Sequence, residues 1–214
     1  MPRRFRPLDR RVAWVTGMSV LLAIVVSMVA QGLTSLIGLV TNLAFYGRVG
    51  TALVSPAHNT LGLWVIGVPM VGGLVVGLMA RFGSRAIRGH GIPEAMEQVL
   101  RNDSRIPPII TWLKPVSSAV AIGTGGPFGA EGPIIATGGA LGSLLGQWTH
   151  VTADERKTLL AAGAAAGMSA VFAAPMAAVL LSIELLLFER RARSLIPVAL
   201  AAAVGAAAHI LLEG

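Results

Sequence analysis

The sequence predicts an all-α membrane protein that crosses the bilayer several times, and three observations lead to this fold class. Only 13% of the residues are charged and 54% are hydrophobic, whereas a soluble domain carries about 25% charged residues. Five long stretches contain no charged residue, namely 12–47, 49–80, 132–153, 158–183 and 194–212. Glycine and proline break the apolar sequence at two further places. Because a spanning helix needs about 20 apolar residues, we expect a polytopic protein of about eight helices, several of them short or broken.

The charges divide the chain into a basic tail, residues 1–11, and a transmembrane domain, residues 12–214. The net charge is +7, and most of the arginines gather at the ends of apolar stretches: Arg3, Arg4, Arg6, Arg10, Arg11, Arg81, Arg85, Arg88, Arg190, Arg191 and Arg193. This distribution follows the positive-inside rule. We therefore expect an integral protein of a bacterial-type inner or plasma membrane with its N-terminus in the cytoplasm. Lipid is an expected partner and nucleic acid is not.

The first apolar stretch is interpreted as a membrane span over residues 12–44. Its basic flank also fits a signal peptide, but the apolar core of a signal peptide has about 7–15 residues. Here the apolar sequence continues past Leu39 without a convincing cleavage site. A second span is expected over residues 60–82. It contains Gly73 and Gly77, a small-residue pair that permits close helix contact, and Pro69 is a candidate kink.

Two short helices are expected next. Pro93 suits the first turn of a helix, and Glu94 then lies near the positive end of that helix. Residues 102–108 end it. The apolar segment 109–122 that follows is too short to cross the bilayer without its neighbours.

Four further helices complete the expected fold. The first carries glycines at every fourth position on one face, and the second has Thr152 as a capping residue with acidic residues directly after it. Pro175 opens the third. The expected ranges are 131–148, 153–172, 175–188 and 194–212.

The two glycine-rich breaks, GHGIP at residues 89–93 and GTGGPFGAEGP at residues 123–133, favour an anion-binding site. A helix that begins inside the membrane has unpaired N–H groups at its start, and in lipid these groups need a partner. An anion is a suitable partner because that end of the helix is positive, and glycine lets the anion approach the backbone. Two such helices are expected to point their amides at one small anion and to bind it reversibly.

Glu131 is the one charged residue of the second break. An ionised carboxylate at a helix start takes the place of an inorganic anion. Its displacement by that anion, or its neutralisation by a proton, would open the path. The alternative is that Glu131 simply caps its helix, because helix starts favour acidic residues. The spacing alone leaves both interpretations open.

Three motifs in register resemble signature regions of the CLC family of chloride channels and chloride/proton antiporters: GHGIPE at 89–94, GAEGP at 129–133 and GAAAGMSAVFAAP at 163–175. The resemblance covers nearly everything from the first span onward. The resemblance implies anion transport of the voltage-gated chloride channel type. It also implies that the protein is not an enzyme. Chloride or another small anion is the expected ligand, with no cofactor and no metal. It also implies a homodimer with one pathway in each subunit, built from two inverted repeats.

The resemblance also assigns residues to the site. Glu131 matches the gating glutamate of the family, and the rest of its loop is matched by Gly129, Ala130, Gly132 and Pro133. The inner anion-binding loop is matched by Gly89, His90, Gly91, Ile92 and Pro93. Glu184 aligns with a further family glutamate and is a secondary candidate. It has either a functional role or a structural one, packed against Arg190 or a backbone donor.

The sequence departs from the family pattern at three positions. His90 stands where many chloride-selective members have serine; its ring either donates an N–H to the anion or points away and leaves binding to the backbone. Ala130 replaces the usual lysine or arginine, which removes a positive charge from the pore entrance. Leu185 replaces the second glutamate of many antiporters. This last change favours a channel or an uncoupled transporter.

The resemblance extends to the first repeat only, and no part of the chain matches the second. A partner chain that supplies the second repeat is one interpretation. A non-conducting or regulatory subunit, or a truncated product, that dimerises with a CLC partner is another. An unrelated transporter with a similar broken-helix loop is the third. Enzymatic function is not expected, because the chain shows no Walker loop and no paired nucleophile and base, and His58, His150 and His209 are scattered.

Overall fold

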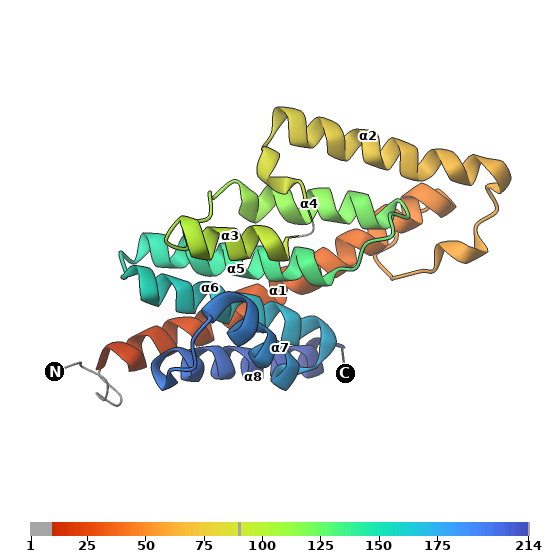
Figure 1. The fold of residues 1–214 in the computed structure, drawn as a ribbon. Coiled ribbons are helices and arrows are strands. Elements are labelled where there is room, and N and C mark those ends of the chain that lie inside the picture. The colour runs from red at the N-terminus through yellow and green to blue at the C-terminus, as the bar shows by residue number, and fades with distance from the viewer. Residues whose placement is uncertain (1–9, 90, 214) are drawn as a thin grey trace.

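The computed structural model describes residues 10–89 and 91–213, which form a bundle of α-helices (Figure 1). The helices are α1 (Arg10–Tyr46), α2 (Gly67–Phe82), α3 (Ile92–Arg101), α4 (Ile110–Gly123), α5 (Glu131–Trp148), α6 (Ala153–Phe172), α7 (Pro175–Ser182) and α8 (Ala192–Glu213). Short 3₁₀ turns cover Pro56–His58, Gly62–Ile66 and Arg85–Ile87, and a π-helical turn, Ile183–Leu187, extends α7. The described residues contain no strand, so the predicted all-α fold class is confirmed.

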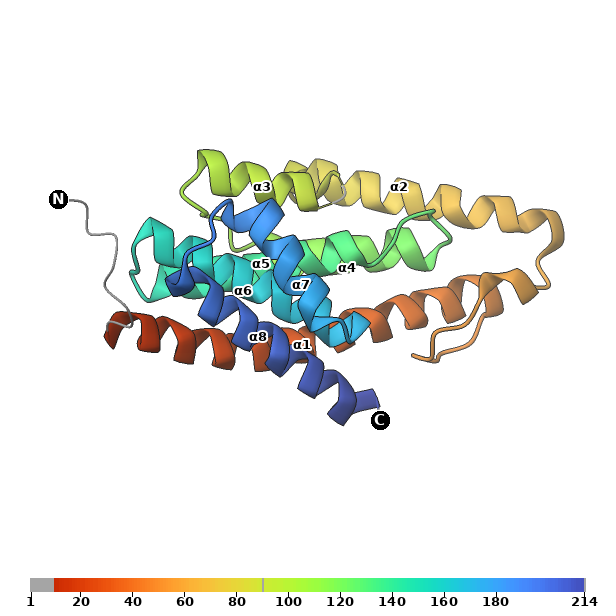
Figure 2. The ribbon, with the colours of Figure 1, turned by 60° about the horizontal axis from the view of Figure 1, so that its bottom comes forward.

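Three helical segments among the described residues are long and apolar enough to cross a membrane: Arg10–Tyr46, Gly62–Phe82 and Ala192–Leu212. With 37 residues, α1 is about 55 Å long at 1.5 Å per residue. Because the hydrocarbon core is about 30 Å thick, a helix of this length is tilted or extends beyond it. Figure 2 shows α1 running along the length of the bundle.

Helix α6 forms the centre of the fold and packs against α1, α5, α7 and α8 (Figures 1 and 2). All residues from 158 to 170 are buried. The predicted glycine face of α5 lies against this helix: a β-carbon on Gly138 would meet the carbonyl of Gly163, and one on Gly142 would meet that of Leu159. The two backbones are therefore in direct contact, as small residues permit in membrane helices.

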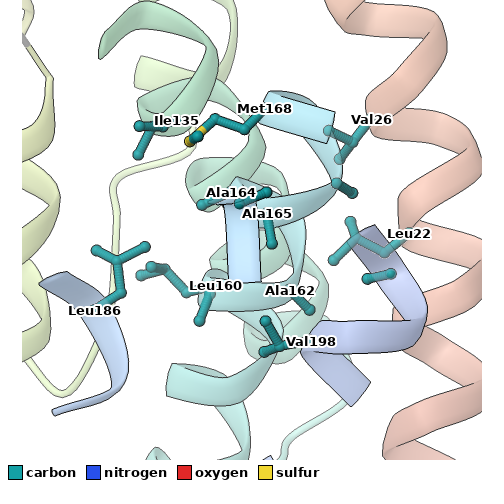
Figure 3. Close-up of a cluster of buried hydrophobic side chains, with 14 of the residues drawn as sticks. Leu22, Val26, Ile135, Leu160, Ala162, Ala164, Ala165, Met168, Leu186 and Val198 are labelled. Carbon is teal, nitrogen blue, oxygen red and sulfur yellow. The ribbon is translucent and has the colours of Figure 1, made fainter. Parts of the chain in front are cut away.

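Larger side chains fill the space around α6 (Figure 3). Leu22 and Val26 of α1, Leu160 of α6, Leu186 of the π-helical turn and Val198 of α8 belong to one buried cluster. In lipid there is no hydrophobic drive to join apolar helices, so this cluster stabilises the fold mainly through van der Waals contact.

Ion pairs join α1, α6 and α8 at one end of the bundle. The Arg11 guanidinium donates hydrogen bonds to Glu155, with Nε 2.5 Å from Oε1 and Nη2 3.1 Å from Oε2. Thr152 and Glu155 form the capping box that starts α6, and Arg193 donates to Asp154 at 3.2 Å. Partial burial opposes ionisation of Glu155, but the hydrogen bonds from Arg11 and Thr152 outweigh it and lower its pKa.

Helix α2 is the least buried part of the bundle and, among the helices, lies against α4 (Figure 1). Gly73 and Gly77 permit a close helix contact, but β-carbons on these glycines would meet nothing within 4 Å among the described residues. The kink at Pro69 stays a prediction. Pro69 lies in the first turn of α2, where its missing N–H breaks no helical hydrogen bond.

Candidate functional site

The two glycine-rich breaks lie against each other where α3 and α5 begin. A β-carbon on Gly91 would lie 2.6 Å from the carbonyl oxygen of Gly132 and 3.0 Å from the β-carbon of Ala136. Gly91 also has a φ of 110°, a conformation that L-residues with a side chain rarely adopt. Glycine is therefore required at position 91 for two reasons. Its absence of a side chain brings the start of α3 into contact with the first turns of α5.

The start of α3 is closed by its own carboxylate. The N–H of Gly91 donates to Oε2 of Glu94 at 2.6 Å, and the first helical hydrogen bond runs from the N–H of Ala95 to the carbonyl of Gly91 at 3.1 Å. Pro93 contributes no N–H. Glu94 is half-buried and is held in place by this bond.

The start of α5 has a different arrangement. Glu131 is the first residue of the helix, and its side chain is exposed and makes no hydrogen bond or ion pair among the described residues. Its carboxylate folds back toward its own loop, since a β-carbon on Gly129 would lie 3.1 Å from Oε2. Gly132 and Pro133 are buried beneath it, and Ala130 is half-buried. The carboxylate therefore lies at a helix start without a capping bond.

A buried lysine, Lys114 of α4, supports the loop before α3. It is 2% exposed, and its Nζ donates to the carbonyl of Ile87 at 3.0 Å and to that of Gly89 at 2.8 Å. Sequence reasoning did not single out this residue. The available signal was the charge itself, because an ionisable residue within an apolar membrane segment is rare.

A cavity of about 340 Å³ opens beside the α3 start. The cavity wall is formed by the loop after α2 and by parts of α3, α4 and α5. Its charged lining residues are Arg85, Arg88, Glu94, Glu97 and Lys114, and Gly91 and Ala136 also line it. Gly91 thus lies at the wall of a polar cavity on one side and against α5 on the other. An anion that entered this cavity would approach the positive end of α3.

His90 and Glu184 are the remaining predicted residues. His90 is outside the described residues. Glu184 lies in the π-helical turn that packs against α3, but it is not among the residues that line the cavity. Glu184 is exposed and makes neither an ion pair with Arg190 nor a hydrogen bond to a backbone donor among the described residues, and its role stays a prediction.

Comparisons with known proteins agree on one family. The family model described as "Voltage gated chloride channel" matches residues 71–214. The "H(+)/Cl(-) exchange transporter ClcA" of Salmonella arizonae is 36% identical over 149 residues, which cover 64% of this chain and 29% of that protein. The "Putative chloride channel protein ClcB-like" of Ralstonia nicotianae is 32% identical over 114 residues, which cover 51% of this chain and 27% of that protein.

The fold is also similar to a solved structure. A slow cyanobacterial Cl-/H+ antiporter, known from a crystal structure, matches 97% of this chain with a TM-score of 0.73 and 21% sequence identity. The match covers 48% of the antiporter chain. The present chain therefore spans about half of that solved protein and less than a third of the two curated relatives.

Proposed function

The chain belongs to the voltage-gated chloride channel family, and from that premise we propose that it forms part of a pathway for chloride or another small anion, with Glu131 as the gate. The observation that carries the proposal is the contact between Gly91 and Gly132, which joins the starts of α3 and α5. Both helices direct the positive ends of their dipoles to this junction. Partial charges of this kind attract an anion and still release it, as conduction requires.

The gate follows from the state of Glu131. Its carboxylate is exposed and has no partner among the described residues, so nothing in the described chain holds it at one position. In the proposed cycle it occupies the anion position at the start of α5 while ionised. Protonation, or displacement by an incoming anion, releases that position. The inner loop that meets the anion from the other side comprises residues 89–93.

We also propose how the chain is oriented in the membrane, how it assembles and whether proton flow is coupled to it. The protein is an integral membrane protein, and its N-terminus is proposed to be cytoplasmic because Arg11 and Arg193 lie at the same ion-paired end of the bundle. The functional assembly is proposed to be a dimer in which each pathway also contains the other half of the family fold. No cofactor is needed for this function, since the anion is the transported ligand. Leu185 favours uncoupled flow over proton exchange.

The experiment is chloride efflux from liposomes that contain the chain, alone and with a chain that supplies the other half of the fold. The anion panel is chloride, fluoride and nitrate, with and without a pH gradient. We expect selective efflux and a change of about tenfold or more in rate in Glu131→Gln, since competing charges at one site interact by several kcal/mol at an effective dielectric constant of about 20. Asp154→Asn is the matched control, because Asp154 is an exposed carboxylate at the ion-paired end of the bundle and does not line the cavity.

Equal efflux rates in the wild type and Glu131→Gln would refute the gate. The alternative function, a non-conducting or regulatory subunit, predicts a different result. The chain would then co-purify with a full-length CLC protein and change its rate, while neither the chain alone nor its mixture with the other half would release any anion.

A further inference from the structure

Two cations of the described residues are buried, and they provide a comparison. Arg156 of α6 is 5% exposed, and its Nε donates to the carbonyl of Asp103 at 2.8 Å. This bond ties the loop after α3 to α6 and lies outside the cavity lining. Lys114 is 2% exposed and has the same kind of acceptor, but both of its carbonyls belong to the loop that leads into α3.

That loop requires external support. Gly89 has a φ of 91° and Gly91 a φ of 110°, so two of its residues have conformations that are open mainly to glycine and are flexible in an unfolded chain. Lys114 binds the carbonyls of Ile87 and Gly89 directly before this segment. The peptide unit that carries the Ile87 carbonyl also carries the N–H of Arg88, which donates to the carbonyl of Arg85 at 3.1 Å. Lys114 and this turn bond together fix the path of the chain directly before α3.

The loop is held from a second side by Glu94. Its carboxylate accepts the N–H of Gly91 and interacts electrostatically with Lys114. The two charges line the same cavity and bind opposite ends of the backbone between them, carbonyls on one side and an amide on the other. At 2% exposure, Lys114 offers an anion in the cavity little direct contact. Its bonds are to the loop carbonyls, so its removal should change the loop first.

We propose that Lys114 is a positioning residue for the inner anion-binding loop: its ammonium group holds the carbonyls of Ile87 and Gly89 and thereby keeps the loop in the form that lines the cavity at the start of α3. The inference rests on the proposed function, because it assumes that the anion meets this loop. Removal of the ammonium group leaves the buried carbonyl of Ile87 and the carbonyl of Gly89 without this donor. The loop then opens, and its affinity for the anion falls.

The test compares Lys114→Met with Arg156→Met, which both remove a buried cation that is bonded to backbone carbonyls. Two quantities are measured on the full chain: hydrogen exchange of the peptide covering residues 83–92, and chloride affinity from the chloride-dependent shift in Tm. In Lys114→Met we expect exchange in this peptide to be about tenfold faster and chloride affinity about tenfold weaker, the usual size for losing a charged hydrogen bond. In Arg156→Met both should stay at the wild-type values, and faster exchange should appear near residues 102–105.

Lys114→Arg is the second variant in case Lys114→Met does not fold. It keeps the charge and the donors, so slow exchange of residues 83–92 and most of the chloride affinity should return. Wild-type exchange rates in Lys114→Met would overturn the inference, and so would an equal loss of chloride affinity in the lysine and arginine variants. A wild-type chain whose Tm does not respond to chloride would instead contradict the proposed function, while the exchange data would still decide whether Lys114 holds the loop.

Discussion

The starts of α3 and α5 contain the same residue types, glycine, proline and glutamate, and use them in different ways. At α3 the glutamate, Glu94, is the third residue of the helix and accepts the N–H of Gly91. At α5 the glutamate, Glu131, is the first residue and has no bonded partner among the described residues. The carboxylate of Glu94 is therefore held by a hydrogen bond, whereas the carboxylate of Glu131 is not.

The difference follows from their positions in the helix. A carboxylate at the third position reaches back to the residue before the helix, which is the geometry of a capping box. A carboxylate at the first position lies too early to do so and projects from the helix end. The site thus combines a fixed acid with a free acid. A gate needs the free one, and a stable helix start needs the fixed one.

The largest predicted effect concerns the junction itself. Gly91→Ala should destabilise the protein by about 3 kcal/mol or more, because the new β-carbon has both an unfavourable φ and a collision with Gly132. Thermal unfolding in detergent measures the loss. Gly73→Ala in α2 is the matched control, since its β-carbon meets nothing within 4 Å. It should be neutral or stabilising by up to about 1 kcal/mol. Equal losses in the two variants would show that the two starts are not in contact.

A smaller effect separates the two glutamates. Glu94→Ala removes a capping bond and should cost about 1 kcal/mol. Glu131→Ala removes no bond within the described chain and should change stability by less than about 0.5 kcal/mol. Chemical unfolding of the two variants under the same conditions gives the comparison. A larger loss for Glu131→Ala would reverse the assignment of the fixed and free acids.

The smallest effect extends the comparison to a third helix start, that of α6. The pKa of Glu155 is lowered below its ordinary value of 4.5, so its contribution to stability is complete above that pH and is lost as the pH falls through the lower, folded-state pKa. The Tm of Arg11→Gln should therefore lie below the wild-type Tm at pH 7, and the gap should close in acid. A gap of constant size from pH 7 to pH 3 would contradict this ion pair as the cause.

Local signals predicted the helices well. The capping sequence at Thr152, the proline at position 93 and the acid at position 131 each marked a helix start that the structure confirms within a residue or two. Such signals depend on neighbouring residues in the chain, and a sequence shows these directly. The glycine face of α5 was also visible in the sequence, and the structure shows that α6 is its partner.

The features that the sequence did not predict depend on contacts between distant parts of the chain. The contact of Gly91 with Gly132 joins residues about forty positions apart, and no periodicity encodes it. The bonds of Lys114 to the loop before α3 were missed for the same reason. Gly73 and Gly77 of α2 show the converse case. Their spacing permits a close helix contact, but no helix of the described chain lies against them.

The central claim is the proposed gating role of Glu131, and one measurement tests it most directly. It is the initial rate of chloride efflux from liposomes between pH 4 and pH 8, for the assembly containing the wild-type chain, Glu131→Gln or Glu94→Gln. We predict a rate that changes with pH in the wild type and in Glu94→Gln, and a rate independent of pH in Glu131→Gln. A pH dependence that survives in Glu131→Gln and disappears in Glu94→Gln would contradict the claim.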